Sequence, residues 1–285
     1  MNDIHLYIDA FPNRIMTSET EMALTKILTL FQGSLLRITW LYHGQRLSFV
    51  IMLQLILAER RLCKGRGIVI NNAIWFKKVN AITSAATWLL SDFSFSVVLS
   101  ENTSKNISRR LQKKQIDLTE QPCLNDNLSR FLNWLESNPT YKNEVYSSYI
   151  RIALGLPPYS CKYQSCLGKT IYIDKFGKMY SCPFMTNRIE LNDLENCSHL
   201  QDLFDTHKYV QLIQDAITRR GNCQKTSCGV YRFCLGGCPL DIGDCPENGL
   251  TNAINAAKIY MQESGTPPMA IHREICNLLS QQFRV

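Results

Sequence analysis

Two cysteine-rich stretches dominate the second half of this sequence. Residues 161–182 read CKYQSCLGKTIYIDKFGKMYSC, and residues 223–245 read CQKTSCGVYRFCLGGCPLDIGDC. Ten of the twelve cysteines in the chain follow residue 160, and the last of these is Cys276. Short spacings of this kind let one loop supply several thiolates to a single metal centre. The second stretch has little apolar periodicity, so metal ligation is the expected source of its order.

Iron–sulfur clusters, zinc and disulfides are the three kinds of site that such cysteines can form. Structural zinc sites favour Cys-x2-Cys pairs, and the chain has none. Disulfides need an oxidising compartment, whereas residues 1–11 contain acidic residues and lack the pattern of a signal peptide. We therefore expect a cytoplasmic protein that holds [4Fe–4S] clusters. Zinc and plain or disulfide-bonded thiols are the alternatives.

The cysteine spacing resembles that of the SPASM domain, the C-terminal extension of many radical SAM enzymes that mature peptides and proteins. The matching pattern is Cys161-x4-Cys166-x10-Gly177-x4-Cys182, followed after a gap by Cys223-x4-Cys228-x5-Cys234-x3-Cys238. Its most specific piece is FCLGGCP at residues 233–239. The chain departs from the family at Cys223 and Cys228, which are separated by four residues where two are usual.

The resemblance implies two auxiliary [4Fe–4S] clusters. The ligands of the first would be Cys161, Cys166, Cys182 and Cys238. The second would use Cys223, Cys228, Cys234 and one later cysteine, either Cys276 or Cys245. We favour Cys276, because the sequence around it looks like the cysteine-bearing helix that closes this domain in relatives.

The first half alternates strand-like and helix-like segments. We expect strands over residues 4–8, 35–41, 68–70 and 93–99, and helices from residue 18 and over residues 47–62, 79–90, 104–114 and 128–136. This alternation predicts an α/β fold with a parallel sheet and right-handed crossovers. Residues 1–156 would form a partial, radical-SAM-like βα barrel. The consecutive prolines at 157 and 158 mark the start of a second domain, residues 157–285.

The second domain is expected to be a small α+β unit. Residues 170–173 and 178–181 would pair as a β-hairpin around Asp174-Lys175-Phe176-Gly177, in which glycine supplies a positive φ. Helices are expected over residues 200–219, 250–262 and 271–283. Cys182 would lie at the end of the hairpin, which would present its thiolate rigidly.

The predicted barrel lacks two sequence motifs that the resemblance leads one to expect, one for the catalytic cluster and one for S-adenosylmethionine. Radical SAM barrels carry Cys-x3-Cys-x2-Cys after the first strand, but here that loop reads Asp9-Ala10-Phe11-Pro12-Asn13-Arg14. A Gly-Gly-Glu-Pro stretch should end the second strand, where this chain has Thr39-Trp40-Leu41-Tyr42-His43-Gly44. S-adenosylmethionine is therefore not expected as a cofactor unless an upstream segment is missing.

These observations lead to one functional prediction and two alternatives. The chain would use its clusters to relay electrons or to position a precursor peptide or protein, together with a complete radical SAM enzyme or a small electron carrier. It could instead be the C-terminal part of an active radical maturase, or a zinc- or cluster-stapled scaffold that binds a peptide. No catalytic residue can be assigned.

Nucleic acid and membrane are not expected partners. No run of Lys and Arg is interleaved with aromatic residues, although the net charge is +7. The most apolar window, residues 47–58, is too short to span a bilayer.

Overall fold

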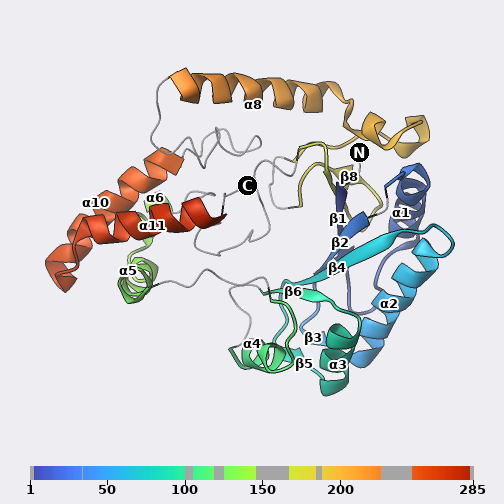
Figure 1. Cartoon of the computed structure of the whole chain (residues 1–285), viewed down its shortest axis with the longest axis horizontal. Coiled ribbons are helices and arrows are strands. Elements are labelled where there is room, and N and C mark those ends of the chain that lie inside the picture. The colour runs from blue at the N-terminus through green and yellow to red at the C-terminus, as the bar shows by residue number, and fades with distance from the viewer. Residues whose placement is uncertain are drawn as a thin grey trace. The chain divides into compact units, whose positions relative to one another are not determined.

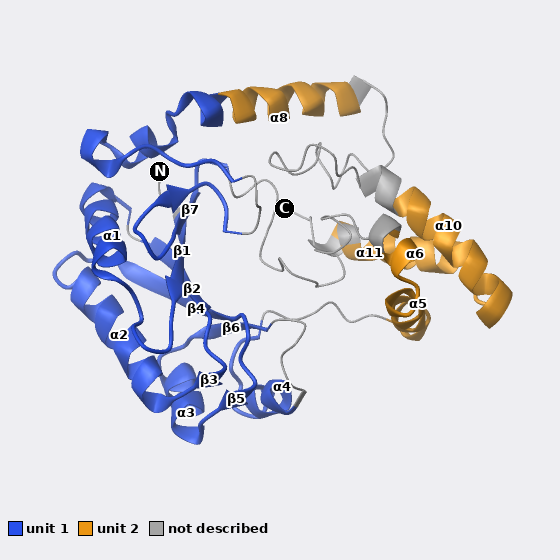
Figure 2. Ribbon diagram, turned by 180° about the vertical axis from the view of Figure 1, so that it is seen from behind, with its two compact units in different colours: residues 1–119, 165–210 blue, residues 120–164, 211–285 orange. Residues whose placement is uncertain are grey.

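The computed structural model describes residues 3–33, 35–99, 105–118, 125–145, 167–183, 188–225 and 246–282. The chain forms two compact units, coloured separately in Figure 2. Unit 1 comprises Met1–Thr119 and Ser165–Val210, and unit 2 comprises Glu120–Gln164 and Gln211–Val285. The predicted domain boundary at residues 156 and 157 lies outside the described residues.

A six-stranded sheet with the order β6-β4-β2-β1-β7-β8 forms the centre of unit 1 (Figure 1). Every neighbouring pair is parallel except the antiparallel pair of β7 and β8. The strands are β1 (Asp3–Ala10), β2 (Leu35–Tyr42), β4 (Val69–Phe76), β6 (Ser96–Leu99), β7 (Thr170–Ile173) and β8 (Met179–Tyr180). The predicted α/β class with a parallel sheet is confirmed.

Four helices alternate with these strands: α1 (Ser18–Leu30), α2 (Phe49–Cys63), α3 (Ser84–Asp92) and α4 (Lys105–Gln112). Side-chain oxygens of Thr17, Ser48 and Thr83 cap the first three, each accepting from a backbone N–H in the first turn. The helix expected from residue 79 begins only at Ser84. The preceding residues form β5 (Ala81–Ile82), which pairs with β3 (Arg46–Leu47).

The two faces of the sheet can be distinguished at Trp40. This fully buried side chain points toward α2, where its Nε1 donates to Glu59 Oε1 at 2.6 Å. Successive residues of a strand point to opposite faces, so Leu41 points away from α2. Asp9 on β1 is in register with Leu41 and shares that second face.

The predicted hairpin is present, but its position was not foreseen. Asp174 Oδ1 accepts from the backbone N–H groups of Phe176 and Lys178, and Gly177 adopts a φ of 77°. Strand β7 pairs in parallel with β1, so the hairpin extends the sheet of unit 1. The sequence had assigned it to the second domain.

Replacing Gly177 with alanine should destabilise unit 1 for two separate reasons. The positive φ is unfavourable for alanine, and a Cβ atom would lie 2.8 Å from the backbone oxygen of Glu19. We expect a loss of about 2 kcal/mol in the free energy of unfolding, measured by urea denaturation. Gly67→Ala is the control, because Gly67 has a φ of 65° and no neighbour within 4 Å of a Cβ. Equal losses in both variants would rule out the contact with Glu19.

Unit 2 contains the helices α5 (Asp126–Glu136), α6 (Pro139–Val145), α10 (Pro246–Ser264) and α11 (Pro268–Gln282). They enclose an apolar core in which Phe131 and Ile275 are fully buried.

The expected helix over residues 200–219 is two elements, the 3-10 helix η3 (Leu200–Phe204) and α8 (His207–Lys225). A second 3-10 helix, η2 (Leu194–Asn196), precedes them. Among the described helices, none is long and apolar enough to cross a membrane.

Candidate functional site

Three of the nine predicted cluster ligands lie among the described residues. Cys182 belongs to unit 1, and Cys223 and Cys276 belong to unit 2. The other six, Cys161, Cys166, Cys228, Cys234, Cys238 and Cys245, lie outside the described residues. Within the described part of the chain, no three His, Cys, Asp or Glu side chains are grouped as a metal site would require. The predicted ligand sets therefore stay predictions.

Cys182 follows a well-ordered edge of the sheet. The backbone N–H of Ser181 donates to the carbonyl of Ile189 at 2.9 Å, and that of Ile189 donates to Ser181 Oγ at 3.2 Å. Tyr180 and Glu190 form an antiparallel bridge one step earlier. The returning segment at residues 188–191 thus fixes the backbone immediately before the predicted ligand.

Cys276 lies on α11, one helical turn after His272. Its Sγ is 3.6 Å from His272 Nε2, and the side chain is partly buried against the helical core of unit 2. A Cys and a His four residues apart share one face of a helix. The two side chains could therefore serve one metal centre together, which the sequence analysis did not consider.

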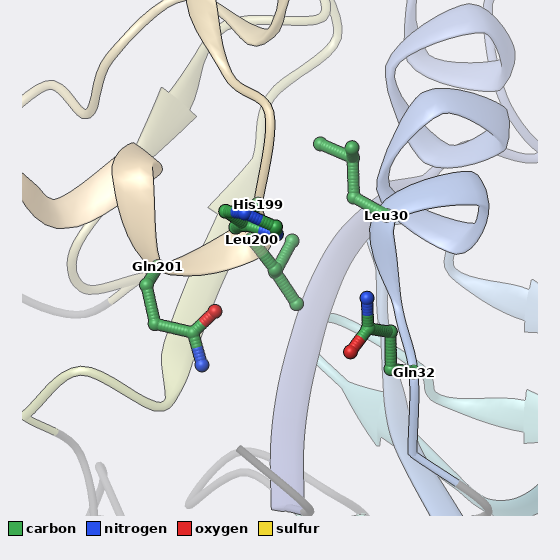
Figure 3. Close-up of a pocket in the computed structure, with 5 residues that line it drawn as sticks. All are labelled: Leu30, Gln32, His199, Leu200 and Gln201. Carbon is green, nitrogen blue, oxygen red and sulfur yellow. The ribbon is translucent and has the colours of Figure 1, made fainter.

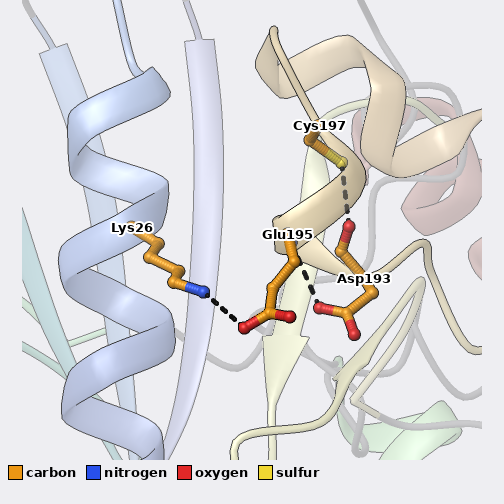
Figure 4. Close-up of polar contacts among 4 residues, drawn as sticks. All are labelled: Lys26, Asp193, Glu195 and Cys197. Carbon is orange, nitrogen blue, oxygen red and sulfur yellow. Dashed lines mark hydrogen bonds and ion pairs between the residues drawn. The ribbon is translucent and has the colours of Figure 1, made fainter.

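Cys63 and Cys197, which fit none of the predicted spacings, have thiol pKa values above the usual range. Partial burial raises the pKa of Cys63 most, and the carboxyl group of Glu59 adds to it. Burial also raises the pKa of Cys197, reinforced by nearby carboxylates. The Cys197 thiol donates to the backbone oxygen of Asp193 at 3.3 Å, beside the ion pair of Lys26 and Glu195 (Figure 4).

We expect Cys63 and Cys197 to react with iodoacetamide more slowly than N-acetylcysteine does at neutral pH. The thiolate is the reactive form, and a raised pKa lowers its population. Peptide mapping by mass spectrometry after timed alkylation measures both sites in the same sample. Labelling as fast as that of N-acetylcysteine would contradict the environment described for these thiols.

A small surface pocket of unit 1 lies between the end of α1 and η3 (Figure 3). It is lined by two leucines, two glutamines and one histidine, namely Leu30, Leu200, Gln32, Gln201 and His199. This set offers neither a thiolate nor a carboxylate. Among the described residues that line the pocket, His199 is the one that could bind a metal or transfer a proton, and no second such group lies beside it.

A hydrogen-bonded group of polar residues lies at the C-terminal ends of the parallel strands, on the face away from α2. Asp9 at the end of β1 is 9% exposed, and each of its carboxylate oxygens has a partner. Oδ1 lies 2.8 Å from His43 Nε2, and Oδ2 accepts from the hydroxyl of Tyr172 at 2.8 Å. The ring of Phe11 stacks on His43 with centroids 4.9 Å apart.

Lys77 and Arg188 add two cations beside this group. Lys77 Nζ lies 4.0 Å from the centroid of the Trp75 ring, and burial lowers its pKa while the charge of Asp9 opposes the shift. The Arg188 guanidinium lies over the rings of Tyr172 and Tyr180, at 4.7 and 4.4 Å from their centroids. Burial, with the carboxylate of Asp9, raises the pKa of Tyr172, so its hydroxyl stays protonated and donates.

We call Asp9, His43, Tyr172, Lys77 and Arg188 the strand-end cluster. In the sequence, the loops that carry Asp9 and His43 stand out only because they lack the expected cysteines and glycines. Tyr172 is 163 residues from Asp9. Only the parallel pairing of β7 with β1 brings these two residues together.

Comparison with solved structures identifies the fold. Native anSMEcpe with bound AdoMet and a Cp18Cys peptide superimposes with a TM-score of 0.53 and 14% sequence identity, over 95% of this chain and 99% of that chain. A histidine-tagged form of anSMEcpe with bound AdoMet gives 0.53 and 15% over the same shares. The chain shares the radical-SAM-like α/β fold of these structures. No family model matches the sequence, and no curated protein matches it.

Proposed function

We propose that this chain is a SPASM-type iron–sulfur protein that positions a peptide and relays electrons, and that it does not cleave S-adenosylmethionine by itself. Its two auxiliary [4Fe–4S] clusters would supply electrons to a partner, either a complete radical SAM enzyme or a small electron carrier. The precursor peptide or protein held by this chain would be the substrate of the radical SAM enzyme. The place of action would be the cytoplasm.

The observation that carries this proposal is the combination of the cysteine spacing with the fold. The Cys161–Cys182 and Cys223–Cys238 patterns resemble those of an auxiliary-cluster domain, and the chain superimposes on a radical SAM structure along 95% of its length. Thiolates are the donors that [4Fe–4S] clusters require. Cys182 on the hairpin edge and Cys276 on α11 are held by ordered elements that could present such donors.

The strand ends of the barrel support the second part of the proposal. The loop after β1 has no cysteine, and its Asp9 carboxylate is engaged by His43 and Tyr172. A cluster that binds S-adenosylmethionine needs three thiolates and one open iron. The residues present at these strand ends do not fit such a cluster.

Peptide binding is supported by one of the similar structures, which holds a Cp18Cys peptide. In our chain the polar side chains of the strand-end cluster lie at the C-terminal ends of the parallel strands. The chain's own residues would bind and orient the peptide there, while the clusters exchange electrons.

The test is an anaerobic assay of the reconstituted protein with S-adenosylmethionine and dithionite. We expect no 5′-deoxyadenosine above the level formed without protein. We also expect the reduced protein to become reoxidised when a complete radical SAM enzyme and S-adenosylmethionine are added. Formation of 5′-deoxyadenosine by this chain alone would refute the proposal in favour of an active maturase.

A further inference from the structure

The strand-end cluster contains two cations, Lys77 and Arg188, and one carboxylate, that of Asp9. A second carboxylate, that of Asp174, lies close enough to raise the pKa of Tyr172, and its Oδ1 accepts from two backbone N–H groups. Both oxygens of the Asp9 carboxylate already accept hydrogen bonds. Among the described residues, no carboxylate lies within ion-pair distance of Arg188.

Arg188 is held in place by aromatic rings. Tyr172 and Tyr180 face each other across β7 and β8 with ring centroids 6.0 Å apart, and the guanidinium lies over both. Stacking leaves the edge of a planar guanidinium available to donate two parallel hydrogen bonds. The hydroxyl of Tyr172 is fixed to Asp9, so this platform cannot turn freely.

The neighbouring groups form the rest of a site. His43 borders it with a side chain that is 33% exposed. Phe11 stacks on His43 and offers an apolar surface beside the charged groups. All of these residues belong to unit 1.

We propose that the strand-end cluster binds the carboxylate of an acidic side chain of the peptide, with Arg188 as its main anchor. A carboxylate matches the two parallel donors of a stacked guanidinium. The aromatic rings of Tyr172 and Tyr180 would cover the aliphatic part of the acidic residue. This inference rests on the peptide-holding part of the proposed function and names its substrate class as an acidic peptide.

The experiment measures peptide affinity by fluorescence anisotropy. The probes are a short fluorescein-labelled Gly/Ser peptide that contains glutamates and the same peptide with glutamines instead. We expect tighter binding of the glutamate peptide, and Arg188→Gln should weaken that binding about tenfold or more and abolish the preference. Arg188→Lys, which keeps the charge but not the planar donors, should retain part of the affinity.

Arg61→Gln is the matched control. Arg61 is an exposed arginine of the same unit, and its guanidinium lies 2.7 Å from Glu21. We expect this variant to bind like the native protein. Equal affinity for the two peptides, or equal losses in Arg61→Gln and Arg188→Gln, would overturn the inference.

Two further measurements keep the result interpretable. Displacement of the glutamate peptide by inorganic phosphate at lower concentration than by glutarate would reassign the site to phosphate and overturn the inference. Circular dichroism checks that Arg188→Gln is folded, and Lys77→Gln provides a second variant that should also lower the affinity. Iron is measured in each sample, so a failed peptide result in iron-loaded protein refutes this inference alone.

Discussion

Cys182→Ser should lower the iron content of the reconstituted protein from about eight to about four atoms per chain, because four thiolates hold each cubane cluster. Serine is a much weaker iron ligand than a thiolate, so the first cluster should not form. The second cluster draws on other predicted ligands and should remain. Anaerobic reconstitution followed by iron and acid-labile sulfide analysis measures the loss.

Cys197→Ser is the matched control for this variant. Cys197 is also in unit 1, but its thiol donates to the backbone oxygen of Asp193 and its pKa is raised by burial. We expect its replacement to leave the iron content unchanged. Full iron retention in Cys182→Ser would remove Cys182 from the ligand set.

The second large effect is expected at Glu59, which should make the stability of unit 1 depend on pH. This carboxyl group is 5% exposed and accepts from Trp40 Nε1 at 2.6 Å and from Asn72 Nδ2 at 2.8 Å. Burial raises its pKa to about 8, although both donors oppose the shift. The Oδ1 atom of Asn72 is buried without a hydrogen-bond partner, and a protonated Glu59 could donate to it if the amide turned.

The direction in which stability changes with pH follows from proton binding. Between the ordinary pKa of an unfolded glutamate and about 8, the folded protein holds a proton at Glu59 that the unfolded chain has released. The contribution of Glu59 to stability is therefore complete at low pH. It falls as pH rises through this window, by on the order of 1 kcal/mol per pH unit.

Glu59→Gln should remove this dependence. Its amide can still accept from Trp40 and can donate to Asn72 Oδ1 after a turn of the asparagine amide. We expect the difference in free energy of unfolding between the variant and the native protein to shift in favour of the variant from pH 5 to pH 8. Anaerobic denaturant titrations at several pH values measure it.

Glu190→Gln serves as the reference substitution. Glu190 belongs to the same unit, but its side chain is 56% exposed and pairs with Lys178. We expect the difference in free energy of unfolding between Glu190→Gln and the native protein to stay constant from pH 5 to pH 8. If the difference in free energy of unfolding for Glu59→Gln were also independent of pH, the described burial of the Glu59 carboxyl group would be contradicted.

Much of the fold could be predicted from local patterns. The strand–helix alternation of the first half predicted the parallel sheet, and Gly177 marked the turn of the hairpin. The helix expected from residue 18 begins there, with Thr17 as its N-cap. The start expected at residue 79 was wrong, because residues 81–82 form a short strand and the helix begins at Ser84.

The strand-end cluster could not be predicted from the sequence for a topological reason. Asp9 lies on β1 and His43 directly follows the neighbouring strand β2, but the contact with Tyr172 depends on β7 joining the sheet beside β1. A short hairpin gives no local signal for the strand it will pair with. The charge of Lys77 and Arg188 around this contact also becomes visible only once the strands are assembled.

The most direct test of our account is the metal content of protein purified and reconstituted without oxygen. Two cubane clusters predict about eight iron atoms and a matching amount of acid-labile sulfide per chain, with a thiolate-to-iron absorption band near roughly 400 nm. Zinc bound at these cysteines in place of iron would contradict it.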